Sequence, residues 1–220
     1  MSAITLFGAG SWGTALSAHL ASTGRDVTLW ARRAEVAEAI HRTGHNPRYL
    51  PTLPIPSSIH VTADLDEAAA ASQLWGLAVP SQKLRARAES LRSAAGPDVR
   101  VVSLAKGIEN DTLMTMTQVL DDVFDAVPSS RIGTLSGPSH AEEVAEERPT
   151  TVVAAAPEDR VAEHIQDAFM TEGLRVYVNT DVVGVEIGGA AKNVLAIAAG
   201  IGDGVGYGDN AKAALITRGL

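Results

Sequence analysis

The fold of this chain is decided by its opening stretch, Ala3-Ile4-Thr5-Leu6-Phe7-Gly8-Ala9-Gly10-Ser11-Trp12-Gly13-Thr14-Ala15-Leu16. An apolar run of strand length leads directly into the spacing Gly8-x-Gly10-x-x-Gly13. The apolar residues that follow, up to Leu20, recur with the period of a helix. A strand, a glycine-rich turn and a helix in this order are the context that a dinucleotide-binding turn requires.

Each glycine has a physical role in such a turn. Gly8 allows the tight turn, Gly10 lets the backbone approach a pyrophosphate, and Gly13 lets the helix pack closely on the strand. The free N–H groups of the first helical turn would then face the phosphates. We interpret the stretch as a nucleotide site; the alternative is a glycine-rich turn with a structural role alone.

Strands alternate with helices along most of the chain. We expect strands at 3–7, 26–30, 59–62, 74–79, 100–104, 132–135, 150–155 and 175–178. We expect helices at 12–20, 33–42, 64–71, 81–94, 113–123, 140–147 and 158–170. Residues 44–58 are rich in Pro, Asn and Gly and predict a loop. With right-handed crossovers, this alternation predicts an α/β fold with a Rossmann-like, doubly wound, mainly parallel sheet.

The pattern changes near Asp181. Residues 182–201 show no β alternation and predict one long buried helix rich in Ala and Gly, and a second helix is expected at 210–220. We therefore expect an N-terminal dinucleotide-binding domain over residues 1–180. Residues 181–220 would be the start of an all-α C-terminal substrate domain that is apparently truncated.

Composition narrows the class of protein. The net charge of −8 is unfavourable for a polyanion-binding surface, so we expect no nucleic-acid partner. Cysteine is absent and the six His residues lack metal-ligand spacing, so we expect no metal. The longest apolar stretches, such as 194–201, are shorter than a membrane span, and no signal peptide precedes the first strand. We expect a cytoplasmic protein without membrane insertion.

The end of the second expected strand bears on the choice of cofactor. A carboxylate there binds the ribose hydroxyls of NADH, whereas an Arg accommodates the 2′-phosphate of NADPH. This strand is followed by Arg32 and Arg33, with no carboxylate before Glu35. The pattern favours NADPH over NADH; the alternative is two solvated arginines at the start of a helix.

Two further groups follow strand ends. Lys106 precedes a glycine and is either a cation for a substrate or cofactor oxygen or an exposed loop lysine. The run Ser136-Gly137-Pro138-Ser139 precedes a helix, so its N–H groups and the Ser139 hydroxyl could hold an anion. Ser139 is also a candidate N-cap, with Glu142 or Glu143 completing a capping box.

Lys192 is the strongest catalytic candidate. It lies among mostly small or apolar residues, where burial would lower its pKa and suit it to proton transfer. Glu186 and Asn193 are possible orienting groups, and Gly188-Gly189 would allow a close approach by backbone or cofactor. The alternative is a lysine that extends to solvent from the edge of a helix.

These residues carry a family resemblance. The chain resembles bacterial-type NAD(P)-dependent glycerol-3-phosphate dehydrogenase over its whole length. The matching segments are 8–15, 30–32, 46–51, 78–81, 105–109, 135–144, 184–193 and 208–220. The last two, with Gly184-Val185-Glu186-Ile187-Gly188-Gly189-Ala190-Ala191-Lys192-Asn193 and Gly208-Asp209-Asn210-Ala211-Lys212, are the most specific. Where this chain has Ala191, the family more often has Leu.

The resemblance implies reversible hydride transfer between NAD(P)H and dihydroxyacetone phosphate, giving sn-glycerol 3-phosphate, a glycerophospholipid precursor. It implies cofactor contacts at Ser11, Trp12, Arg32, Arg33, Tyr49, Lys106 and Ala141, beside Gly8, Gly10 and Gly13. It implies substrate contacts at Lys106, Gly137, Ser139 and Lys192, with Lys192 as the proton donor or acceptor at the C2 oxygen and Lys106 assisting. The family's further catalytic Asp and its Ser-Arg-Asn phosphate-binding run would follow residue 220. The expected partners are a small phosphorylated substrate and, as a possible assembly, a homodimer.

Two alternatives belong to other classes. A β-hydroxyacid dehydrogenase has a similar layout but carries an Asn one helical turn after its catalytic lysine, where this chain has Ala196. A non-catalytic NADPH-binding protein would keep the glycine-rich turn and lack the reaction. Mixing the chain with dihydroxyacetone phosphate and NADPH would distinguish the second alternative from an enzyme.

Overall fold

The computed structural model describes residues 3–219. Its strands are β1 (Ile4–Phe7), β2 (Val27–Trp30), β3 (His45–Asn46), β4 (Leu50–Pro54), β5 (His60–Thr62), β6 (Leu74–Leu77), β7 (Arg100–Ser103), β8 (Ile132–Ser136), β9 (Thr150–Ala155) and β10 (Leu174–Asn179). Its α-helices are α1 (Ser11–Ser22), α2 (Ala34–Thr43), α3 (Leu65–Ala70), α4 (Leu84–Leu91), α5 (Met116–Val123), α6 (Ala141–Ala145), α7 (Asp159–Phe169), α8 (Val182–Gly204) and α9 (Asp209–Gly219). Short 3-10 turns are η1 (Ser81–Lys83), η2 (Arg92–Ala94) and η3 (Ser129–Arg131).

Eight strands form one sheet in the order β10-β9-β8-β7-β6-β1-β2-β5. All neighbours are parallel except β8 and β9, so the expected mainly parallel, doubly wound α/β sheet is confirmed. The chain builds outward from β1 to β2 and β5, then crosses back to β6 on the other side of β1. This reversal creates a crevice at the carboxyl ends of β1 and β6, where such sheets bind ligands.

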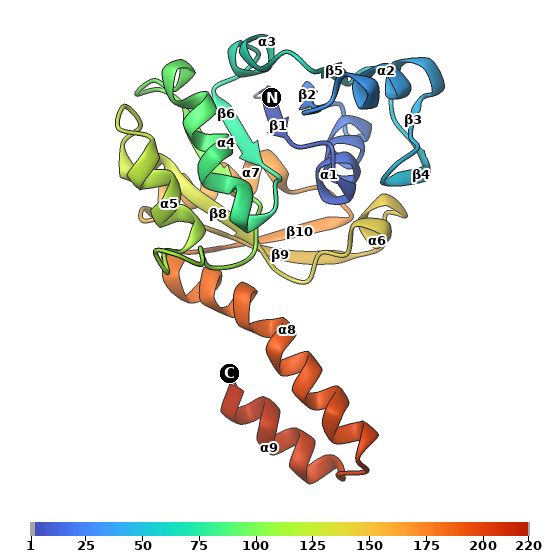
Figure 1. Cartoon of the computed structure of the whole chain (residues 1–220), viewed down its shortest axis with the longest axis vertical. Coiled ribbons are helices and arrows are strands. Elements are labelled where there is room, and N and C mark those ends of the chain that lie inside the picture. Colours follow the sequence, from blue (N-terminus) through green and yellow to red (C-terminus); the bar gives the residue numbers. More distant parts are fainter. Residues whose placement is uncertain (1–2, 220) are drawn as a thin grey trace.

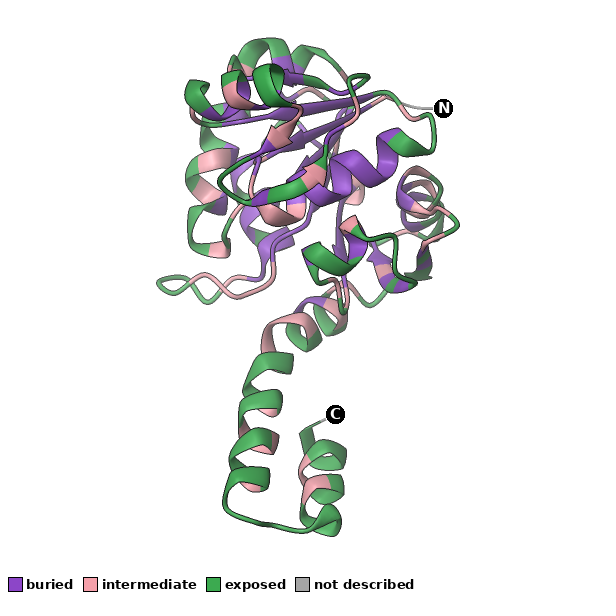
Figure 2. Ribbon diagram, turned by 90° about the vertical axis from the view of Figure 1, so that its right-hand side faces the viewer, coloured by how far each residue is buried: buried purple, intermediate pink, exposed green. Residues whose placement is uncertain are grey.

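Alternating side chains of the sheet form a core on each face. On one face, Leu6 and Val102 pack with apolar residues of α1, α2 and α7. On the other face, Phe7 and Trp75 pack with apolar residues of α3, α4 and α5. Helices therefore cover both faces of the sheet, and its central strands β1, β2, β6 and β8 are buried along their length, whereas the edge strand β10 is exposed at its carboxyl end (Figures 1 and 2).

The sequence predicts a loop at 44–58, and this prediction is wrong in part: the segment contains the antiparallel strand pair β3 and β4. Gly44 ends α2 with φ +67°, and its carbonyl accepts the N–H of Ile55 at 2.8 Å. Asn46 is fully buried and donates from Nδ2 to the carbonyl of Ala9 at 3.1 Å and to the Thr14 hydroxyl at 2.9 Å. A segment with loop composition is thus held in register by one buried amide.

Two expected helices are shorter than predicted. The helix at 81–94 is divided into η1, α4 and η2, because Lys83 has the non-helical angles φ −119° and ψ 0°. The helix expected from residue 113 begins at Met116, since Leu113 has φ +59°. Thr115 then starts α5 with a capping box formed with Gln118.

The two C-terminal helices project from the α/β part of the molecule (Figure 1). The predicted helix at 182–201 is present as α8, but the prediction that it is buried is wrong: only Glu186 in it is buried (Figure 2). Among residues 3–219, α8 packs mainly on α9 and β8, which leaves apolar side chains exposed, such as Val194, Ile197 and Ile201. Apolar composition alone therefore overestimated burial.

Helix α8 also corrects the statement that no apolar stretch has the length of a membrane span. By length and composition alone it is long and apolar enough to cross a membrane, which a helix of a soluble protein can also be. Its first turns instead dock on the α/β part: Glu186 bonds to Thr117 of α5, and Gly189 lies against Ser136 of β8.

Candidate functional site

Five parallel strands end at one edge of the sheet in the spatial order β8, β7, β6, β1, β2. Each is followed by a polar or glycine-containing group. They are Gly137–Ser139 after β8, Lys106-Gly107 after β7, Pro80-Ser81 after β6, Gly8–Gly13 after β1, and Arg32-Arg33 after β2. The topology therefore gathers residues that lie far apart in the sequence along one edge.

In the glycine turn after β1, two glycines are required for packing within the protein, and the third lies next to open space that a ligand could occupy. Gly8 has φ +130°, and a Cβ there would collide with the carbonyl oxygen of Ala78. A Cβ on Gly13 would collide with the carbonyl oxygen of Gly8, so both glycines are required for close packing. Gly10 differs, because no protein atom lies within 4 Å of the position of a Cβ there.

The surroundings of Gly10 fit a dinucleotide pyrophosphate. Gly10 is extended, with φ −81° and ψ −175°, and α1 begins immediately after it. No side chain caps that helix, so the first-turn N–H groups can bind an anion at the positive end of the helix dipole. The open space beside Gly10, which a Cβ would narrow, has room for the pyrophosphate. The uncapped N-terminus of α1 next to it would attract the negative charge of the pyrophosphate.

A cavity of about 390 Å³ adjoins this turn. Its walls are formed by Gly8, Ala9, Gly10, Trp30, Ala31, Arg32, Arg33, Val36, Tyr49, Ala78, Val79, Pro80, Lys83 and Arg87. Arg33 donates to the hydroxyl of Tyr49 at 3.1 Å, and its Nε lies 3.8 Å from a carboxylate oxygen of Glu35. The expected residues Gly8, Gly10, Arg32, Arg33 and Tyr49 thus share one cavity.

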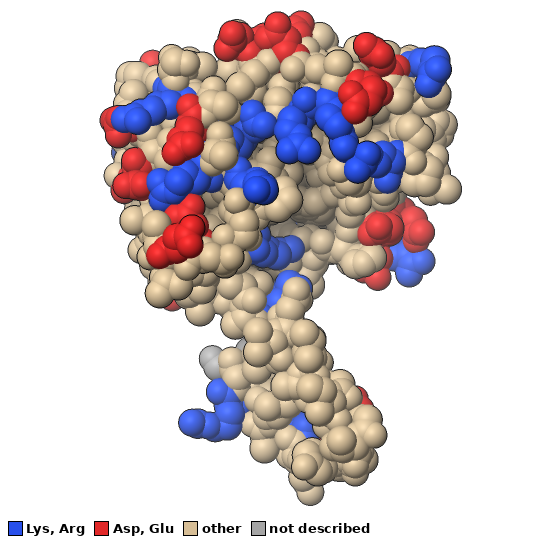
Figure 3. All heavy atoms as spheres, in the orientation of Figure 1, with Lys and Arg blue, Asp and Glu red and all other residues tan. Residues whose placement is uncertain are grey.

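Two cations of this cavity, Lys83 and Arg87, were missed by the sequence reasoning. The available signal was their spacing: they stand four residues apart in the helix expected at 81–94, and residues at that spacing lie on one face of a helix. Basic side chains gather around the hollow of this face, although the chain as a whole carries net charge −8 (Figure 3).

Other expected cofactor residues lie outside the walls of this cavity: Ser11, Trp12, Gly13, Lys106 and Ala141. Trp12 packs with Ala141 in a small cluster that also contains Ala15 and Leu50. This cluster joins α1 to α6 and β4 beside the glycine turn.

Lys106 lies at the other end of the strand edge. It is half-buried, and its ammonium donates a 2.6 Å hydrogen bond to the hydroxyl of Ser139. Burial, and next the charge of Lys192, lowers the pKa of Lys106 from its ordinary value. A desolvated cation held by a neutral partner is suited to an oxyanion ligand.

Gly107 and Gly137 shape the backbone around Lys106. Gly107 has φ +145°, and a Cβ there would lie 2.7 Å from the hydroxyl oxygen of Ser81. Gly137 has φ +148°, and a Cβ there would lie 2.9 Å from Cα of Val152. Both positions are strained for any residue with a side chain.

The alternative role of Ser139 as a helix cap is corrected by the structure. The N-cap of α6 is His140, which makes no side-chain capping bond. The Ser139 hydroxyl instead accepts from Lys106 and lies 3.4 Å from the carbonyl oxygen of Gly137.

Lys192 is exposed, so the expectation that it is buried is corrected. Its ammonium donates to Oδ1 of Asn193 at 2.7 Å, which confirms one expected contact. Glu186 does not orient Lys192, because its carboxylate binds Thr117. A Cβ on Gly189 would lie 2.5 Å from the Ser136 hydroxyl and 3.9 Å from Cγ of Lys106, whereas Gly188 has no such neighbour.

Within residues 3–219, no cluster of three or more His, Cys, Asp or Glu side chains is placed to hold an ion.

The glycine turn at the switch point and the cationic strand edge define a Rossmann-like α/β protein of the dinucleotide-binding type. The family model for the N-terminus of NAD-dependent glycerol-3-phosphate dehydrogenase matches residues 3–162, and that for its C-terminus matches residues 181–220. The chain belongs to the NAD-dependent glycerol-3-phosphate dehydrogenase family.

Relatives and solved structures agree with this membership. The chain is 74% identical, over its full length, to 64% of glycerol-3-phosphate dehydrogenase (NAD(P)+) 1 of Salinibacter ruber. It is 51% identical, over 99% of its length, to 65% of a glycerol-3-phosphate dehydrogenase (NAD(P)+) of Chlorobium phaeobacteroides. The crystal structure of a glycerol-3-phosphate dehydrogenase from Coxiella burnetii superposes on 99% of this chain with TM-score 0.87 and 35% identity, over 66% of that chain. This chain therefore spans just under two thirds of these proteins.

Proposed function

We propose that this chain carries the cofactor site and part of the active site of an NAD(P)-dependent sn-glycerol-3-phosphate dehydrogenase. The observation that carries the proposal is the arrangement of Lys106, hydrogen-bonded to Ser139, on the same strand edge as the glycine turn, with α8 passing beside it. Family membership and the names of the relatives, which include NAD(P)+ and glycerol-3-phosphate, support the reaction. Dihydroxyacetone phosphate would be the substrate of the reverse reaction.

The cofactor would extend along the strand edge. Gly8, Gly10, Ser11, Trp12 and Gly13 would bind the pyrophosphate region. Arg32, Arg33 and Tyr49 would hold the adenosine end beside β2, and Lys106 and Ala141 would contact the nicotinamide end. When bound, the nicotinamide donates or accepts the hydride at its C4. We propose NADPH as the preferred form and NADH as the second, because Arg32 and Arg33 follow β2 and no carboxylate lines the cavity.

The chain's own residues would bind and polarise the substrate. Lys106 would donate to the C2 oxygen from a half-buried position, where its charge is weakly screened. Gly137 and Ser139 would hold a substrate oxygen through a backbone N–H and the hydroxyl already paired with Lys106. Lys192 would give the proton to the C2 oxygen during reduction and take it back during oxidation.

We also propose a domain organisation, a cellular location and an assembly for the protein. Residues 1–180 would form the dinucleotide-binding domain, and residues 181–220 would begin the substrate domain. We place the protein in the cytoplasm, without nucleic-acid partner or membrane insertion, and regard a homodimer as a possible assembly. The net charge of −8 supports the lack of a nucleic-acid partner, and a chain without cysteine fits a reducing compartment.

The test combines binding and turnover. We expect the chain to bind NADPH and to oxidise it when dihydroxyacetone phosphate is added, read from nicotinamide absorbance. A rise in melting temperature with NADPH but no oxidation would instead support a non-catalytic binding protein.

Lys192 is tested by two substitutions and a control. Lys192→Ala and Lys192→Arg should both lower kcat by at least roughly a hundredfold, because neither side chain exchanges the proton at neutral pH. Lys212→Ala is the control, since that lysine pairs with Asp203 at 2.6 Å within the projecting helices. Near wild-type turnover in Lys192→Ala would refute the assignment.

A further inference from the structure

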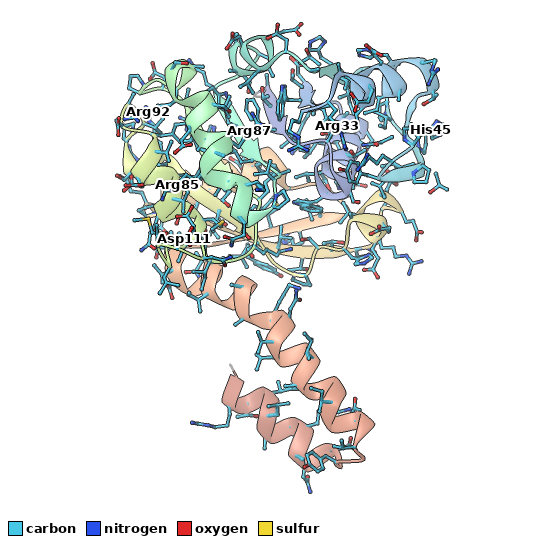
Figure 4. All side chains as sticks on the ribbon, viewed as in Figure 1. Arg33, His45, Arg85, Arg87, Arg92 and Asp111 are labelled. Atoms are coloured by element: carbon cyan, nitrogen blue, oxygen red, sulfur yellow. The ribbon has the colours of Figure 1, made fainter. Side chains whose placement is uncertain are left out.

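The cavity beside the glycine turn has a cationic wall on each side. One wall is the segment after β2, with Arg32 and Arg33, and the other is formed by Lys83 and Arg87, at and after the start of α4. Arg33 and Arg87 therefore come from different elements that meet across this cavity (Figure 4). No Asp or Glu lines it.

The guanidinium of Arg87 is held in a fixed position. It lies over the indole ring of Trp30, the last residue of β2, with its Cζ 4.0 Å from the ring centre. One of its terminal nitrogens donates to the Ser90 hydroxyl at 2.9 Å. Stacking on Trp30 restricts the side chain, so its binding of an anion costs less conformational entropy.

The charge of Arg87 is not compensated by the protein. Its Nε is buried without a hydrogen-bond partner, and within the described part of the chain no carboxylate oxygen lies within 4.0 Å of Lys83 or Arg87. Burial, and next the charge of Arg32, lowers the pKa of Arg87 from its ordinary value. Like charges are thus held together at some cost, which a bound anion would offset.

The position of Arg32, Lys83 and Arg87 indicates which part of a dinucleotide they would bind. The pyrophosphate region lies at the N-terminus of α1, whereas Trp30, Arg32 and Arg87 surround the end of β2, where the ribose of an adenosine is read. Ribose hydroxyls without phosphate are normally bound by a carboxylate, which is missing from these walls. A phosphomonoester dianion matches convergent guanidinium and ammonium groups.

We propose that Lys83 and Arg87 determine cofactor specificity by binding the 2′-phosphate of NADPH opposite Arg32. Arg87 acts from a position fixed by Trp30, and the exposed Lys83 adds a second charge from the same wall. This inference rests on the proposed nicotinamide-dinucleotide site.

The test measures the dissociation constants of NADPH, NADH, adenosine 2′,5′-bisphosphate and 5′-AMP. Arg87→Gln should weaken NADPH and the bisphosphate roughly tenfold, and Lys83→Gln should weaken them by a few-fold, with NADH and 5′-AMP changed less than about twofold. Arg87→Lys should recover only part of the loss, since it keeps the charge and loses the planar stacking. Arg92→Gln is the matched control, because Arg92 pairs with Asp125 and is not part of the cavity wall (Figure 4).

The outcomes distinguish a failure of the proposed dinucleotide site from a failure of the role proposed for Lys83 and Arg87. Wild-type chain that binds neither dinucleotide would overturn the proposed function and this inference together. Wild-type chain that binds both, with Arg87→Gln and Lys83→Gln weakening NADPH and NADH equally or not at all, would overturn this inference alone. If Arg87→Gln loses its folded circular dichroism spectrum, the exposed Lys83 decides the question by itself.

Discussion

The buried carboxylate of Glu186 accepts the backbone N–H of Thr117 at 3.0 Å and the hydroxyl of the same residue at 2.5 Å. Thr117 lies in the first turn of α5, where N–H groups lack helical partners. The bond therefore fixes the beginning of α8 to the α/β part of the molecule. Lys192 lies six residues further along α8, so its position depends on this contact.

Removing this carboxylate should destabilise the protein. We expect Glu186→Ala to lower the free energy of unfolding by about 2 kcal/mol, because the N–H and hydroxyl of Thr117 would lose their charged acceptor. Glu186→Gln keeps one acceptor oxygen and should lose about half as much. Urea unfolding followed by circular dichroism measures both, with exposed Glu163→Ala as the control. Equal stability in all three variants would show that the bond contributes nothing.

The glycine turn allows fold and ligand binding to be separated by matched substitutions. Gly13→Ala should lower the free energy of unfolding by about 3 kcal/mol, since its Cβ would collide with the Gly8 carbonyl. Gly10→Ala should change it by less than about 1 kcal/mol, yet weaken NADPH binding at least roughly tenfold by narrowing the space for the pyrophosphate. Melting curves and cofactor titrations measure the two effects. Unchanged NADPH affinity in Gly10→Ala would place the pyrophosphate elsewhere.

Lys106 should make substrate affinity fall at alkaline pH. Its pKa in the folded chain lies below the ordinary 10.5, because burial and the charge of Lys192 disfavour the cation. Affinity for dihydroxyacetone phosphate should therefore decline as pH rises through that lowered pKa. Lys106→Arg remains charged over this range and should bind without that decline. Titrations across the alkaline range test the expectation, and an identical decline in both proteins would assign it to another group.

The lowered pKa of Lys106 should also make the free energy of unfolding increase with pH in the alkaline range. Because the unfolded chain holds the Lys106 proton more tightly, it binds more protons between the lowered pKa and 10.5, and stability gains with pH over that window. Lys106→Arg should lack this gain. Urea midpoints measured at several pH values in that window provide the check.

His19 should make the fold sensitive to acid. Burial lowers its pKa below 6.5; the charge of Glu147 opposes this shift and that of Arg25 adds to it. Its Nε2 lies 2.6 Å from the Thr171 hydroxyl oxygen, which joins α1 to the segment after α7. As pH falls below 6.5, the unfolded chain gains the proton before the folded chain does, so stability decreases toward and through the lowered pKa.

A substitution isolates this contribution. His19→Gln should flatten the decrease in the free energy of unfolding between about pH 7 and pH 5. His41→Gln, at an exposed position of α2, should leave it unchanged. If the wild-type and His19→Gln proteins lose stability in parallel, acid sensitivity arises from other groups.

Much of the fold was predictable because its signals are local. The run Ile4–Phe7 followed by three spaced glycines predicted the first strand, turn and helix, and later alternation predicted the layered sheet. The helix expected at 64–71 is present as α3, and Asp64 caps it by accepting the N–H groups of Asp66 and Glu67. The strands at 45–54 were missed, since their pairing depends on buried Asn46, whose partners lie more than thirty residues away.

The site was predictable only in part, for a related reason. Arg32, Lys106 and Ser139 follow strand ends, and topology alone brings such positions to one edge. The burial of Lys192 was predicted wrongly because apolar neighbours in a sequence do not supply a packing partner. The sequence did not predict Lys83 and Arg87 as binding residues. They share a cavity with Trp30 only because strands that are distant in the sequence pair in the sheet.

The amino-acid sequence was enough to predict the class of fold, the glycine turn, the order of elements and the residue types at each strand end. These properties follow from hydrophobic period, glycine conformation and chain connectivity, all of which act between near neighbours. The tertiary structure decided which lysine is desolvated, which carboxylate binds α5 rather than a lysine, and which cations face one another across the cavity. Those outcomes depend on burial and on distances between separate elements, which arise only when the sheet and its helices are assembled.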